Sequence, residues 1–197
     1  MMLDELNGLD SRLIDAADHG DTKAVKTLLA AGADVHAKNE GALWWAAENG
    51  HAKTVKILLA AGADVHAQND WALRSAACWG RTETVKVLLA AGANVHAKDD
   101  CALRRAAYFG HTETLRVLAR HIFAADSWRG KSRAEIEAGA STLYDKIKAN
   151  IPSNPIKPER LRETGHILID AAIDCWHQVR PPPKLTISPL PAQPSPL

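Results

Sequence analysis

Residues 32–61, GADVHAKNEGALWWAAENGHAKTVKILLAA, return almost unchanged in the two stretches that follow. Residues 62–91 read GADVHAQNDWALRSAACWGRTETVKVLLAA, and residues 92–121 read GANVHAKDDCALRRAAYFGHTETLRVLARH. A self-similar period of roughly 20–50 residues is typical of repeat proteins, in which stacked copies bury a common core. The thirty-residue period therefore predicts a solenoid, whose long continuous surface is suited to binding.

Each copy predicts two short helices. The Gly-Ala-Asp/Asn-Val-His segment predicts a turn followed by an extended stretch, and Ala-Leu-x-x-Ala-Ala predicts a first helix that ends at Gly50 or its counterparts. Val55, Leu58 and Leu59 recur at helical spacing in the second helix and are expected to form the internal seam. We therefore predict an all-α chain whose units must stack, because one unit alone cannot bury its apolar face.

The repeats resemble those of the ankyrin family. The resemblance rests on AAENGH (46–51), TVKILL (54–59) and AGADV (61–65), and it covers roughly residues 10–121. It implies an ankyrin-repeat solenoid of helix-turn-helix units. The copies are shorter than the usual unit of about 33 residues, so we expect the family's β-hairpin to be reduced to a bare turn. Short repeats of this kind are similar to those of viral, phage and bacterial ankyrin proteins.

The rest of the chain is expected to extend the array. A capping unit (1–31) and repeats 32–61, 62–91 and 92–121 would make up an ankyrin array over residues 1–125. Helices from Ser132 to Asn150 and from Pro158 to Arg180 are predicted to form a C-terminal helical cap over residues 126–180, with a homodimer interface as the alternative. Residues 181–197, which hold most of the ten prolines, are predicted to be a Pro-rich tail.

The copies differ at a few positions in the turn and the first helix. The resemblance implies that these positions line the concave groove, where ankyrin proteins usually bind their partners. Aromatic residues and arginine gather there, and they dominate interface hot spots. The predicted partner-binding residues are Trp44, Trp45, Asp70, Trp71, Arg74, Trp79, Asp100, Arg104, Arg105, Tyr108 and Phe109. Alternatively some rings pack internally, and a cation–π pair between Trp44 and Arg74 is one such arrangement.

These features predict a protein-binding module, and more sharply an inhibitor or effector that occludes a site on its partner. The alternative is single-stranded nucleic-acid binding, with bases stacked between the aromatic rings and Arg74, Arg104 and Arg105. The net charge of +1 favours neither a nucleic acid nor a membrane as partner. Three cysteines at irregular spacing and the lack of a signal peptide predict a cytoplasmic protein.

We expect no enzymatic activity, no cofactor and no metal. His36, His66 and His96 recur in register, but packed helices are separated by about 8–10 Å, whereas zinc requires ligands about 2 Å away. These histidines are instead expected to bond to backbone in the turn. Residues 125–132 loosely fit a phosphate-binding loop that includes Lys131, but no strand precedes them, and a capping box explains Ser132.

Overall fold

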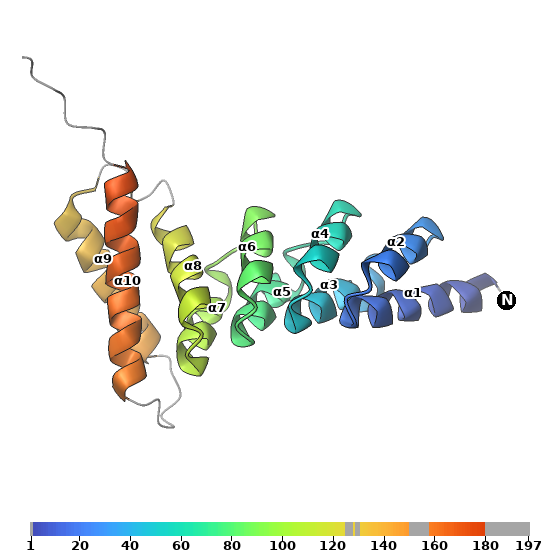
Figure 1. Cartoon of the computed structure of the whole chain (residues 1–197), viewed down its shortest axis with the longest axis horizontal. Coiled ribbons are helices and arrows are strands. Elements are labelled where there is room, and N and C mark those ends of the chain that lie inside the picture. The colour runs from blue at the N-terminus through green and yellow to red at the C-terminus, as the bar shows by residue number, and fades with distance from the viewer. Residues whose placement is uncertain (1, 125–127, 129–130, 150–157, 180–197) are drawn as a thin grey trace, which may run out of the picture.

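The computed structural model describes residues 2–124, 128, 131–149 and 158–179, and every regular element within them is a helix. The prediction of an all-α fold is therefore confirmed. Figure 1 shows successive helix pairs following one another along the longest axis of the molecule. The Pro-rich tail predicted over residues 181–197 lies outside the described residues.

Eight helices form four consecutive pairs in the part of the chain up to residue 124. The pairs are α1 (Met2–Asp18) with α2 (Thr22–Ala30), α3 (Ala37–Asn49) with α4 (Ala52–Ala60), α5 (Ala67–Cys78) with α6 (Thr82–Ala90), and α7 (Ala97–Phe109) with α8 (Thr112–Phe123). The first helices α1, α3, α5 and α7 pack against one another in that order. The second helices α2, α4, α6 and α8 form a parallel layer.

The buried seam repeats with the sequence period. The first helices each bury one leucine and the second helices another, all almost fully enclosed: Leu13, Leu43, Leu73 and Leu103, then Leu28, Leu58, Leu88 and Leu118. Each such side chain contributes about 1.5–3 kcal/mol on burial. Val55 is buried as predicted, whereas Leu59 lies at the edge of the core and is half-buried.

The turn that opens each repeat is left-handed, and the predicted extended stretch is wrong. Lys38, Asn39 and Glu40 have φ values of 50°, 55° and 65°, and the same three positions of the next two repeats have the same conformation. Such a run is costly for residues with a Cβ. It replaces the β-hairpin within three residues, so the first helix can begin at once.

Neighbouring repeats are tied at the start of each second helix. His51 Nε2 lies 2.8 Å from the carbonyl oxygen of Asp18. In the next repeat, the Arg81 side chain contacts the carbonyl oxygen of Glu48 at 3.0 Å. In the repeat after that, the His111 side chain contacts the carbonyl oxygen of Cys78 at 2.9 Å. These side chains lie over Gly20, Gly50 and Gly80, the glycines that end the first helices with positive φ. A Cβ atom at any of these glycines would collide with the His51, Arg81 or His111 side chain that links the two repeats.

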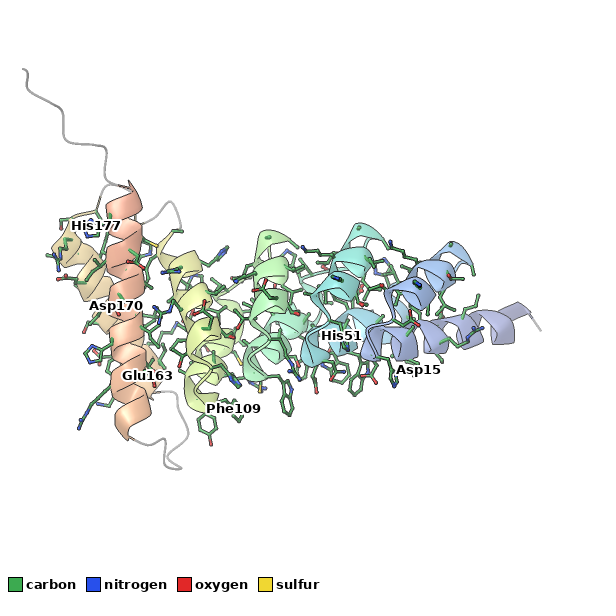
Figure 2. The ribbon with its side chains drawn as sticks, viewed as in Figure 1. Asp15, His51, Phe109, Glu163, Asp170 and His177 are labelled. Atoms are coloured by element: carbon green, nitrogen blue, oxygen red, sulfur yellow. The ribbon has the colours of Figure 1, made fainter. Side chains whose placement is uncertain are left out.

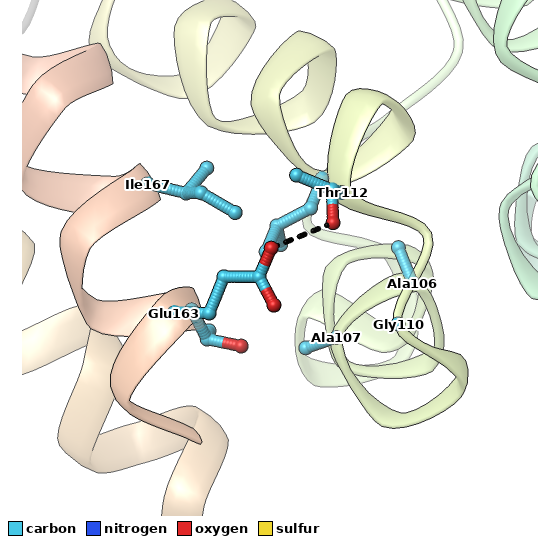
Figure 3. Close-up of a pocket in the computed structure, with 8 residues that line it drawn as sticks. Ala106, Ala107, Gly110, Thr112, Glu163 and Ile167 are labelled. Carbon is cyan, nitrogen blue, oxygen red and sulfur yellow. Dashed lines mark hydrogen bonds between the residues drawn. The ribbon is translucent and has the colours of Figure 1, made fainter. Parts of the chain in front are cut away.

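Two longer helices follow the repeats, close to the predicted bounds: α9 (Arg133–Ala149) and α10 (Pro158–Val179). Helix α10 packs on α8, and α9 packs on α10. Arg120 Nη2 of α8 donates to Asp174 Oδ2 at 2.7 Å. Figure 3 shows Glu163 facing Thr112, whose hydroxyl donates to its carboxylate at 3.1 Å. The C-terminal pair thus continues the stacking direction of the array.

Candidate partner-binding surface

All of the predicted binding residues belong to the first-helix layer. Trp44 and Trp45 are in α3, Trp79 follows α5 directly, and the others lie in α5 and α7. The structure divides them into three groups. Some hold the turns, some pack against one another, and some are exposed.

Asp70 and Asp100 belong to the framework and are not available to a partner. Their side chains are almost fully buried. Oδ1 of Asp70 accepts a hydrogen bond from the backbone amide of Asn94, at 2.7 Å, and from Nδ1 of His66, at 3.1 Å. Each carboxylate therefore fixes the left-handed turn in which it lies, and Asp70 also fixes the following turn. Both residues therefore lie outside the exposed surface of the first helices.

The histidines in the turns serve the same purpose, but not in the way expected from the sequence. Their ring nitrogen bonds to a carboxylate four residues later: His36 to Glu40, His66 to Asp70 and His96 to Asp100. The hydrogen bond that the His36 ring donates to the Glu40 carboxylate raises the pKa of His36 above its ordinary value of 6.5. Among the described residues, no group of three or more His, Cys, Asp or Glu side chains has the geometry of a metal site.

Arg74 is also a framework residue. It is 8% exposed, and its guanidinium donates to the carbonyl oxygens of Asn69 and Gln68, at 2.9 Å each. Arg104 makes the equivalent pair of contacts one repeat later, at 2.9 and 3.0 Å. Each of the two arginines thus donates to two carbonyl oxygens of the left-handed turn in its own repeat. Arg74 makes its cation–π contact with Trp71, whose ring centroid lies 4.8 Å from Cζ, and not with Trp44, the pairing named as an alternative from the sequence.

Three tryptophans form a partly exposed cluster across α3 and α5. The ring centroids of Trp44 and Trp45 are 4.6 Å apart, and Trp44 packs edge-on against Trp71 with ring centroids 5.9 Å apart. The Trp44 indole donates to Glu48 Oε2 at 3.0 Å, and Ser75 Oγ donates to the same oxygen at 2.8 Å. The alternative of internal packing therefore holds in part for these rings. Glu48 is half-buried and belongs to the same surface, whereas Ser75 is buried. The variable position of Glu48 in the repeats was the signal for it.

Trp79 and Phe109 occupy equivalent positions in successive repeats and are the most exposed aromatic side chains in the described part of the chain. They are 55% and 47% exposed. Phe109 packs edge-on against Tyr108 and lies at the lower edge of the array in Figure 2. Arg105 is exposed beside them and donates to Cys78 Sγ at 3.4 Å. The resulting surface combines large aromatic rings with one exposed cation.

The fold is that of a helical-repeat protein, built from stacked helix pairs. Residues 13–99 match the family model described as ankyrin repeats (3 copies), so this segment belongs to the ankyrin-repeat family. Ankyrin repeats are generally protein–protein interaction modules without catalytic activity. No curated protein is significantly similar in sequence to the chain. None of the helices in the described ranges is long and apolar enough to cross a membrane.

Proposed function

We propose that the chain binds another protein through the aromatic surface of its first helices. This aromatic surface consists of Trp44, Trp45, Trp71, Trp79, Arg105, Tyr108 and Phe109. The single observation that supports it best is the exposure of Trp79 and Phe109 at matching positions of two repeats. Large exposed rings are costly to leave in water, and they become hot spots when a partner covers them.

The shape of the array adds to this proposal. Because the first helices stack in one layer, equivalent positions of successive repeats are brought into a row. A partner can therefore contact α3, α5 and α7 at once. A specific interface buries about 800 Å² on each partner, and such an area requires several neighbouring helices.

We further propose that binding is the whole of the activity, so that the protein acts as an inhibitor or effector by covering a site on its partner. Residues 126–180 are proposed to cap the array, because Thr112 and Arg120 of the last repeat both bond to α10. The same helices remain our proposed contact for a homodimer. A repeat array needs such a terminal unit to shield its last seam.

The nucleic-acid alternative finds less support in the geometry. It needs Arg74, Arg104 and Arg105 to face the same strand. Arg74 is buried, and Arg104 is bonded to the carbonyls of its own turn, so Arg105 is the exposed member of the three. Binding of an oligonucleotide that weakens steeply with salt would nevertheless favour this alternative.

The test is a comparison of captured proteins. Trp79→Ala/Phe109→Ala and the matched control Ile169→Ala, which truncates an exposed apolar residue of α10, are used as baits beside the wild-type chain. We expect a partner that is retained by the wild type and by Ile169→Ala but lost with the double variant. Circular dichroism checks that both variants are folded. Equal retention by all three baits would contradict the proposed surface.

A further inference from the structure

A cleft of about 540 Å³ lies between the turn of the last repeat and α9. Its walls come from the end of α8, from Trp128 and from one side of α9, and the turn residues His96 and Asp100 close one corner. The cleft has the size of a small-molecule site, which is typically about 300–1,000 Å³. It shares no residue with the aromatic surface.

The walls of the cleft are mainly apolar. Ile122 and Phe123 are part of the core, and Leu143 is half-buried beside them. Trp128 packs edge-on against Phe123, with ring centroids 5.3 Å apart. The ring of Trp128 lies directly on Gly139, where a Cβ atom would approach it to 2.0 Å. Glycine is disfavoured inside a helix, and here it makes room for the aromatic wall.

The polar corner has its ammonium and imidazole groups on the outside. Nδ1 of His96 and Nζ of Lys146 each lie 2.6 Å from a carboxylate oxygen of Asp100. The Asp100 side chain is 3% exposed, whereas the His96 and Lys146 side chains are 58% and 47% exposed. A molecule that enters from solvent therefore meets the ammonium and the imidazole before the carboxylate. This order favours an anionic group over a cationic one.

We propose that the cleft binds a small amphipathic carboxylate. The carboxylate contacts Lys146 and His96, and the apolar chain lies against Phe123, Trp128 and Leu143. Charge-assisted hydrogen bonds at the edge of an apolar wall orient the ligand. Since the head group binds at the contact between α9 and the last repeat, the ligand also holds these two elements together. The inference does not depend on the proposed protein partner.

The test compares dodecanoate with dodecan-1-ol, both below the concentration at which they aggregate. In calorimetric titrations we expect saturable binding of one dodecanoate, and binding of the alcohol weaker by about tenfold because it lacks the charge. In thermal unfolding we expect dodecanoate to raise the Tm. Lys146→Met keeps the apolar stem of the side chain and should abolish the preference for dodecanoate. Leu143→Trp, which fills the cleft, should weaken binding of both compounds.

Ile169→Trp is the matched control, because Ile169 lines a different groove between α9 and α10. This variant should bind dodecanoate like the wild type. Binding should also shift the indole N–H resonance of Trp128, assigned with Trp128→Phe. If Leu143→Trp is not folded, Thr142→Trp narrows the same cleft from an exposed position. Unsaturable binding, or wild-type affinity in the folded cleft-filling variant, would overturn the proposal.

Discussion

Nζ of Lys146 in α9 lies 2.6 Å from Oδ2 of Asp100, the framework carboxylate of the last repeat. One repeat earlier, the equivalent carboxylate of Asp70 accepts a hydrogen bond from the backbone amide of Asn94, at 2.7 Å. Helix α9 thus supplies a side-chain donor to Asp100, where Asp70 receives a backbone amide from the next repeat. The contact makes α9 a specific neighbour of the array and not only an apolar cover.

Lys146→Met should therefore destabilise the array. His96 still contacts Asp100 in this variant, and Lys146 is partly exposed, so we expect a loss of about 1–2 kcal/mol in the free energy of unfolding. Urea unfolding followed by circular dichroism measures it. Lys148→Met, an exposed lysine on the same helix, is the control and should be neutral. Equal stability of the two variants would mean that the contact adds nothing.

The glycines that end the first helices should be more sensitive to substitution than those that end the second. Gly80 and Gly92 both have positive φ, 65° and 93°. A Cβ at Gly80 would lie 2.5 Å from the His111 ring, whereas one at Gly92 would meet nothing within 4 Å. Backbone strain is common to both alanine variants, and crowding adds about 1–3 kcal/mol at Gly80 alone.

Thermal and urea unfolding of Gly80→Ala and Gly92→Ala test this difference. The φ of Gly80 is the one closer to the left-handed minimum, so backbone strain alone predicts the opposite order. A greater loss in Gly92→Ala would show that the tie through His111 is not important.

The left-handed turn of the first full repeat, which contains His36 and Glu40, should be more stable in acidic solution. The hydrogen bond that the His36 ring donates to Glu40 raises the pKa of His36, so the ring binds its proton more strongly in the folded chain than in the unfolded chain. The stabilisation is complete below the ordinary pKa of 6.5 and is lost as the pH rises through the higher folded value. The stability difference between wild type and His36→Gln should therefore be larger at acidic than at alkaline pH. NMR titration of His36 in folded and urea-unfolded protein checks the direction, and equal values would contradict it.

The repeat period predicted most of the fold, because Leu43, Leu73 and Leu103 must share one environment in a stacked array. The seam, the helix ends and the two C-terminal helices follow from apolar spacing and glycine positions. The three-residue left-handed turn could not be predicted, because Lys38 and Glu40 do not favour positive φ. It exists because side chains from other positions bond to it.

The same reason explains why the site was only partly predictable. Variation between repeats correctly drew attention to the first helices, but it does not distinguish surface from framework. Arg74 and Asp70 differ from their counterparts in the first repeat, Trp44 and Glu40, yet both are buried. Only the geometry of the turn shows that an arginine at this position donates to carbonyl oxygens of the turn that precedes it in the chain.

Arg74→Met should thus reduce stability and leave partner binding intact. The two carbonyl contacts are lost from a buried position, so we expect destabilisation of about 1–3 kcal/mol in urea. Arg104→Met removes equivalent contacts from a more exposed site and should cost less. Affinity for a captured partner, measured well below the unfolding transition, should be unchanged. A large loss of affinity in folded Arg74→Met would return this residue to the binding surface.

Glu40→Asp is expected to stabilise the chain. Asp10 and Asp70 occupy the equivalent position in their units, and each accepts a hydrogen bond at 2.7 Å from the amide 24 residues later, that of Asp34 or Asn94. Glu40 is longer by one methylene, and its buried Oε2 has no hydrogen-bond partner among the described residues.

An aspartate at position 40 would place its carboxylate where Asp70 has it, within reach of the Asp64 amide. Satisfying a buried carboxylate oxygen and this amide together should raise the free energy of unfolding by about 1 kcal/mol. The reverse change, Asp70→Glu, should lower it by a similar amount, because the contact with Asn94 would be displaced. Urea unfolding of both variants gives the two values. If both substitutions destabilise, the longer side chain is required by its own turn, and the carboxylate–amide contact does not set the stability of the repeats.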